Sequence, residues 1–105
     1  MELKHSVKFQ STSMAMAFAL QVVSDAFRDK AIPLVITSVN DGTHMATSLH
    51  YKNAAFDIRS KHIADSAMKH RILGVMRSNL TEDFDVILEQ EGKPNEHYHL
   101  EFQPR

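Results

Sequence analysis

Hydrophobic residues recur at helical spacing over residues 14–30. The apolar positions fall at i, i+4, i+7 and i+11, which is one face of a helix. They are Met16, Leu20, Val23 and Phe27. The serines and threonine of residues 11–13 supply N-cap side chains, and Pro33 prevents the helix from continuing. The pattern therefore predicts an amphipathic helix that buries this face.

A second helical pattern covers residues 61–78, and Ser60 stands where an N-cap is expected. Asn79 is a suitable residue for its C-terminal end. The predicted buried face consists of Ala64, Met68, Ile72 and Val75 or Met76.

The remaining apolar runs are short and rich in β-branched or aromatic residues, which is typical of strands. They cover residues 34–38, 55–58, 84–88 and 97–102. The Asn40–Gly42 segment is a turn signal. Residues 2–10 alternate weakly between apolar and polar positions and predict a short edge strand or an arm.

This order of elements is helix, strand, strand, helix, strand, strand. The last two strands are close enough in the chain to pair as a hairpin. We therefore expect an α+β fold, in which a small, mainly antiparallel sheet carries two helices packed on one face. A length of 105 residues allows one domain, so residues 1–105 are predicted to form a single domain.

Composition narrows the function classes. The net charge is −1 and the Lys and Arg residues are scattered, so we expect no binding to nucleic acid or to an anionic membrane surface. No apolar run approaches the length of a membrane span. The alanine-rich residues 14–20 resemble part of a signal peptide, but the helical pattern continues past them. We therefore expect no signal peptide, and a monomer that is cytoplasmic in the producing cell.

The chain has no cysteine and seven histidines, so a metal would need His, Asp or Glu ligands. Strand alternation puts His97, His99 and Glu101 on one face of the last strand. The same alternation turns Asp57 away from its two apolar neighbours. We expect these polar side chains to share the outer face of the sheet.

His50 precedes Asp57 across a turn that Tyr51–Asn53 can form, so it can return towards the aspartate. Two histidines and one carboxylate suit zinc and leave a fourth position for water. Glu96 is the candidate base for that water, with Glu89 as its rival. Strict alternation places Glu96 on the face opposite to the histidines.

Two stretches that contain these residues resemble the sequence motifs of a known family. The pattern Ser48-x-His50-x-x-Asn53-x-Ala55-x-Asp57, followed by Glu96-x-x-His99, is similar to the motif pair of the D-alanyl-D-alanine carboxypeptidase and dipeptidase superfamily. That zinc-peptidase fold is shared with phage L-alanyl-D-glutamate endolysins and with the hedgehog signalling domain. The resemblance runs from about residue 34 to residue 104.

The resemblance implies zinc ligands and a base. The implied ligands are His50, Asp57 and His99, with Glu96 as the base. His97 would be an accessory residue beside the zinc, able to hydrogen-bond the substrate carbonyl or oxyanion. It also implies that Ser48 orients a ligand or the substrate.

Two positions depart from the family pattern. Asn53 replaces a glycine, and no arginine occurs in residues 37–41, where the family carries the arginine that polarises the substrate carbonyl. His44, Lys52 or Arg59 are candidates to replace it.

The resulting expectation is a zinc metallopeptidase that cleaves peptidoglycan stem peptides containing D-amino acids. Both a D-Ala-D-Ala carboxypeptidase and an L-Ala-D-Glu endopeptidase fit. Such an enzyme would act on the cell wall after release or phage delivery. The alternatives are a zinc-binding module of the same fold without catalysis, and a structural phage component that uses the metal for stability.

Overall fold

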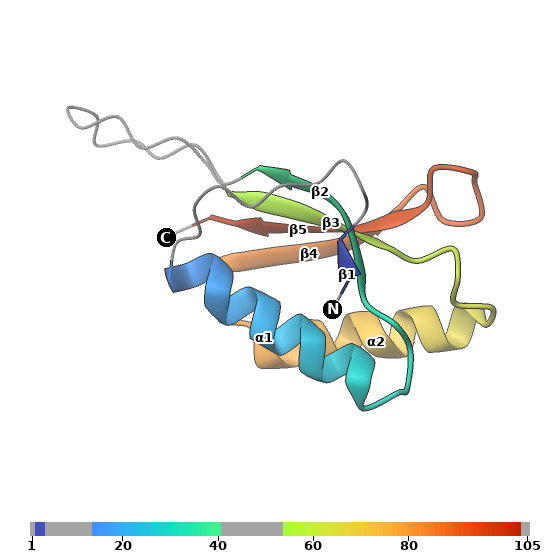
Figure 1. The fold of residues 1–105 in the computed structure, drawn as a ribbon, viewed down its shortest axis with the longest axis horizontal. Helices are drawn as coiled ribbons and strands as arrows, with labels where there is room; N and C mark the ends of the chain where they lie inside the picture. Colours follow the sequence, from blue (N-terminus) through green and yellow to red (C-terminus); the bar gives the residue numbers. More distant parts are fainter. Residues whose placement is uncertain (1, 4–13, 41–53, 104–105) are drawn as a thin grey trace.

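The computed structural model describes residues 2–3, 14–40 and 54–103. Within them, two helices lie on one face of a five-stranded sheet (Figure 1). The elements are β1 (Glu2–Leu3), α1 (Met14–Arg28), β2 (Val35–Asn40), β3 (Ala55–Arg59), α2 (Ser66–Asn79), β4 (Phe84–Glu89) and β5 (His97–Phe102). The predicted α+β class, with both helices on one face, is confirmed. The short β1 is the edge strand expected within residues 2–10.

The strand order is β1-β2-β3-β5-β4. β1 pairs with β2 in parallel, and every other pair is antiparallel. β5 therefore lies between β3 and β4, which run parallel to each other and are joined by α2. The pairing of β4 with β5 confirms the predicted hairpin. This order makes β3 and β5 neighbours near the centre of the sheet, and they carry the polar residues of interest.

The first helix follows its predicted pattern. Of the expected face, Met16, Val23 and Phe27 are buried, whereas Leu20 is only partly buried and Ala19 is fully buried in its place. The backbone of Ala31 enters the left-handed region with φ 56°, so the helix does not continue into the strand that follows.

The start predicted for the second helix is wrong. α2 begins at Ser66, and its N-cap is Asp65, whose side chain accepts a hydrogen bond from the Ala67 amide at 3.0 Å. Ser60 does not cap this helix because its hydroxyl is buried and donates to the Glu96 carboxylate at 2.5 Å. Ala64 consequently lies outside the helix and is exposed.

Alternation along the central strands separates an apolar face from a polar one. Phe56, Ile58, Tyr98 and Leu100 are buried in the core against the helices. The Tyr98 hydroxyl donates to the carbonyl of Lys69 in α2 at 2.6 Å, which ties the sheet to the helix. The residues between them in sequence point to the face away from the helices.

Candidate metal centre

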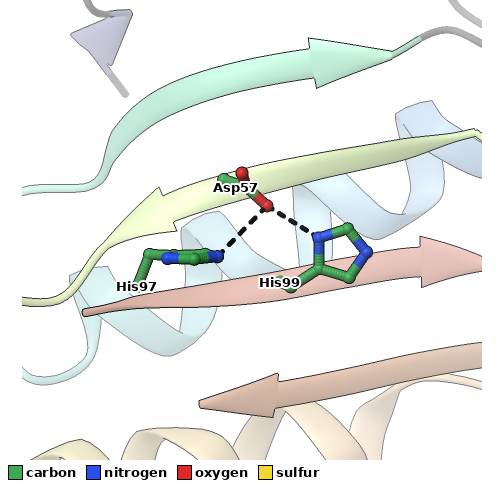
Figure 2. Close-up of side chains that lie close together, drawn as sticks. All are labelled: Asp57, His97 and His99. Atoms are coloured by element: carbon green, nitrogen blue, oxygen red, sulfur yellow. Dashed lines mark hydrogen bonds and ion pairs between the residues drawn. The ribbon is translucent and has the colours of Figure 1, made fainter. Parts of the chain in front are cut away.

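Three side chains from β3 and β5 come together on the outer face of the sheet. The strand register sets Asp57 directly opposite His99, and Arg59 opposite His97. Directly opposed residues have Cβ atoms about 5 Å apart, and diagonal neighbours about 7–8 Å. Figure 2 shows Asp57 reaching from β3 towards both imidazoles of β5, with the helices behind the sheet.

The distances within this group suit a metal ion. One oxygen of Asp57, Oδ1, lies 2.7 Å from His99 Nδ1 and 3.9 Å from His97 Nε2. One ligand atom from each of the three residues lies within 4.8 Å of the others. Ligands bonded at about 2.0 Å in a tetrahedron are separated by about 3.3 Å, a value between the two Asp57 distances. Asp57, His97 and His99 thus form a group that could hold a metal ion, and we call these three residues the metal group.

A backbone carbonyl fixes the tautomer of His97. His97 Nδ1 lies 2.7 Å from the carbonyl oxygen of Asn95. Because a carbonyl oxygen can only accept, Nδ1 carries the proton, and Nε2 of the neutral ring keeps its lone pair. That lone pair is on the nitrogen nearer to Asp57, as expected of a histidine oriented to bind a metal.

His99 lies between two carboxylates. Its Nδ1 is 2.7 Å from Asp57, and its Nε2 is 3.3 Å from Glu101 Oε1. Partial burial lowers the pKa of His99, but the hydrogen bonds to Asp57 and Glu101 and the charges of Asp57 and Glu89 outweigh it, so the pKa is raised. A proton on His99 would therefore compete more strongly with a metal ion for the ring nitrogen than it would on an ordinary histidine.

A further carboxylate borders the group from β4. Glu89 Oε1 lies 3.8 Å from His97 Nε2 and 4.0 Å from His99 Nδ1. The register explains this position, because Glu89 stands opposite His97 in the β4–β5 hairpin. Of the two predicted candidates for the base, Glu89 and Glu96, it is thus Glu89 whose carboxylate lies at the edge of the group.

The structure makes His97 a member of the metal group, whereas the sequence predicted an accessory role. It brings Asp57 and His99 together as predicted. His50, Ser48 and His44 lie outside the described residues, so their predicted roles stay predictions. The sequence feature that could have predicted His97 as a ligand is the His-x-His alternation, which places His97 and His99 on the same face of the strand. The backbone carbonyl of Asn95 that orients His97 could not be predicted from the sequence, because every residue has a backbone carbonyl.

Glu96 lies on the other side of the strand, as alternation suggested. It is buried, and its carboxylate accepts from Ser60 at 2.5 Å, Lys69 at 2.9 Å and the Gly92 amide at 3.0 Å. Burial raises its pKa, but the hydrogen bonds from Gly92, Ser60 and Lys69, together with the Lys69 charge, lower it to about 2. These contacts give Glu96 a structural role, and they do not support the predicted role as a base.

A cleft opens beside the metal group. Its volume is about 260 Å³. The lining residues are Thr37, Ser38, Asp57, Arg59, Lys61, Asn95, Glu96 and His97. A ligand in this cleft would lie against two members of the metal group.

Comparisons of the chain with family models, with curated proteins and with solved structures found no match. None of the described helices is long and apolar enough to cross a membrane.

Proposed function

We propose that this chain is a zinc-dependent peptidase that hydrolyses short peptides containing D-amino acids, such as peptidoglycan stem peptides. The observation that carries the proposal is the group of Asp57, His97 and His99 on the outer face of the sheet. The resemblance of residues 48–57 and 96–99 to the zinc-peptidase motif pair supports the choice of a peptide substrate.

The donor set fits zinc, because two imidazoles and one carboxylate are typical ligands of catalytic zinc. Zinc held there would polarise a substrate carbonyl and acidify a bound water. The carbonyl of Asn95 orients His97, and the Asp57 carboxylate lies beside the His99 ring as a fellow ligand. Glu89 lies close enough to the two imidazoles to act as the proton acceptor near them.

The number of ligands separates catalysis from a purely structural role. Three protein ligands leave a position open for water, whereas four close a zinc site. His50 is also a predicted ligand. If His50 joined Asp57, His97 and His99, the site would be closed. A site closed by four ligands would correspond to the second candidate function, a metal-binding module without catalysis.

The test begins with metal. Wild-type protein should bind one equivalent of zinc, and Asp57→Asn or His99→Gln should weaken binding by about 10-fold or more. His70→Gln is the matched control, since His70 is an exposed histidine on α2 that pairs with Glu91. Purification with iron in place of zinc would overturn the choice of metal, because two histidines and one carboxylate also suit iron(II).

The second arm measures turnover. Mass spectrometry of muropeptide digests should show cleavage by the zinc-loaded protein and none after chelation. His50→Ala and His97→Ala, assayed separately, identify the third ligand by the loss of zinc affinity. Loss of affinity in both variants without any peptide cleavage would exclude the peptidase and establish the closed, silent module.

A further inference from the structure

The cleft beside the metal group carries two cationic side chains. Arg59 and Lys61 line it together with Asp57 and His97. A ligand bound in this space would contact both Asp57 and His97 of the metal group and these two cations.

The fold fixes Arg59 at this position. It follows Asp57 by two residues in β3, so both side chains lie on the outer face of the sheet. It also stands directly opposite His97 in the register of β3 and β5. Across the described ranges, the partly buried Arg59 guanidinium makes no hydrogen bond or ion pair. Its five donors are therefore available to a ligand.

Lys61 is the second cationic residue that lines the cleft. Its Nζ lies 2.5 Å from the carbonyl oxygen of Pro94, in the loop that connects β4 to β5. A carbonyl is neutral, so this hydrogen bond positions the ammonium group without cancelling its charge. Two of the three donors of Lys61 remain for other partners.

The carboxylates that line the cleft are engaged with other partners. Asp57 is hydrogen-bonded to His99 and belongs to the metal group. Glu96 is buried and paired with Lys69. Within the described residues, neither Asp57 nor Glu96 forms an ion pair with Arg59 or Lys61, so both cations can pair with a ligand.

We infer that Arg59, assisted by Lys61, binds a carboxylate of the ligand beside the metal group. The planar guanidinium matches a carboxylate with two parallel hydrogen bonds. This inference rests on the proposed function and narrows its substrate class to peptides that carry a free carboxylate next to the bond that is cleaved.

The test compares a peptide with its amide. Acetyl-D-alanyl-D-alanine and its C-terminal amide are titrated calorimetrically into the full chain, both zinc-loaded and metal-free. Wild-type protein should prefer the free acid by about 10-fold or more, because hydrogen bonds between charged groups are the strong ones. Arg59→Gln should remove the preference and leave zinc affinity unchanged. Arg71→Gln, the same change at an exposed arginine of α2, should keep it.

Several results would overturn the inference. These are equal binding of acid and amide by the wild type, no binding of either, or an unchanged preference in Arg59→Gln. If Arg59→Gln does not fold, Lys61→Gln serves in its place. The inference is then overturned if Lys61→Gln keeps the full preference for the acid and added salt does not reduce the preference of the wild type. Inorganic phosphate that binds more tightly than the peptide would replace the carboxylate with a phosphoryl ligand.

The zinc arm keeps this test separate from the proposed function. An acid preference in metal-free protein that binds no zinc would retain the carboxylate site and reject the peptidase. Zinc binding with no preference for the acid would reject the carboxylate site and leave the proposed peptidase standing.

Discussion

Three donors converge on the Glu96 carboxylate: the Ser60 hydroxyl, the Lys69 ammonium and the Gly92 amide. They come from the end of β3, from α2 and from the loop before β5. Glu96 therefore ties together the segments that surround the start of β5, where His97 stands. The sequence indicated through alternation that Glu96 faces away from the histidines. It could not indicate these partners, which lie 4 to 36 residues away in the chain.

Glu96→Gln should destabilise the fold at neutral pH. Its removal leaves the Lys69 ammonium, whose side chain is only 14% exposed, without a counter-charge, at a cost of about 3 kcal/mol. Because the pKa of Glu96 is depressed from 4.5 to about 2, its contribution is present above pH 4.5 and is lost as the pH falls towards 2. Urea unfolding at several pH values should show this acid loss in the wild type and not in the variant. Glu82→Gln, at an exposed position, is the control. A variant with unchanged stability but no turnover would instead point to the base role.

The two carboxylates around His99 make metal binding sensitive to pH. They raise the pKa of His99, so its proton is held to a higher pH and competes with the metal. Zinc affinity should therefore rise as the pH rises through this raised pKa. Glu101→Gln removes one of the carboxylates and should move the rise to lower pH, measured by competition with a zinc chelator. An unchanged midpoint would show that Glu101 does not hold the proton.

At the scale of elements, the strands and the start of α1 at Met14 were predictable, whereas the start of α2 was not. The boundaries of β5 match the predicted strand because its alternation is strict, and the hairpin follows from the short separation of β4 and β5. The start of α2 was mispredicted since Ser60 and Asp65 are both good capping residues. The buried Glu96 takes the Ser60 hydroxyl, which leaves Asp65 to cap the helix.

Asp65→Ala should therefore lower stability by about 1 kcal/mol and the melting temperature by about 4 °C. The cause is the loss of the hydrogen bond from the Ala67 amide, together with the favourable negative charge at the helix N-terminus. Thermal unfolding by circular dichroism measures it, with Glu82→Ala as an exposed acidic control. A larger effect in Glu82→Ala than in Asp65→Ala would argue against the cap.

At the scale of the whole molecule, the metal group depends on the strand order. The sequence predicted that Asp57 and His99 share the outer face, but not that β3 and β5 are adjacent. The strand order depends on the crossover through α2. It places β4 one strand position away from β3, and β5 pairs with both strands in the position between them. The neighbouring position of His97 and Asp57 follows from that register.

A metal bound there would link two central strands and should stabilise the folded chain. At a free zinc concentration of 100 times the dissociation constant, the gain is about 2.7 kcal/mol, or about 10 °C in melting temperature. Scanning calorimetry with zinc and with a chelator measures the difference. Asp57→Asn should abolish the increase, whereas His70→Gln should keep it. A zinc-dependent increase that persists in Asp57→Asn would place the metal elsewhere.

The insertion of β5 between β3 and β4 also has a kinetic consequence. The β4–β5 hairpin is local and can form within about 1–10 μs, bringing His97, His99 and Glu89 together. Asp57 joins them only when that hairpin pairs with β3, and it is separated from His99 by 42 residues. Closing so long a separation is slow compared with local pairing. In a refolding experiment, zinc capture would therefore lag behind hairpin formation and report the rate at which β3 and β5 meet.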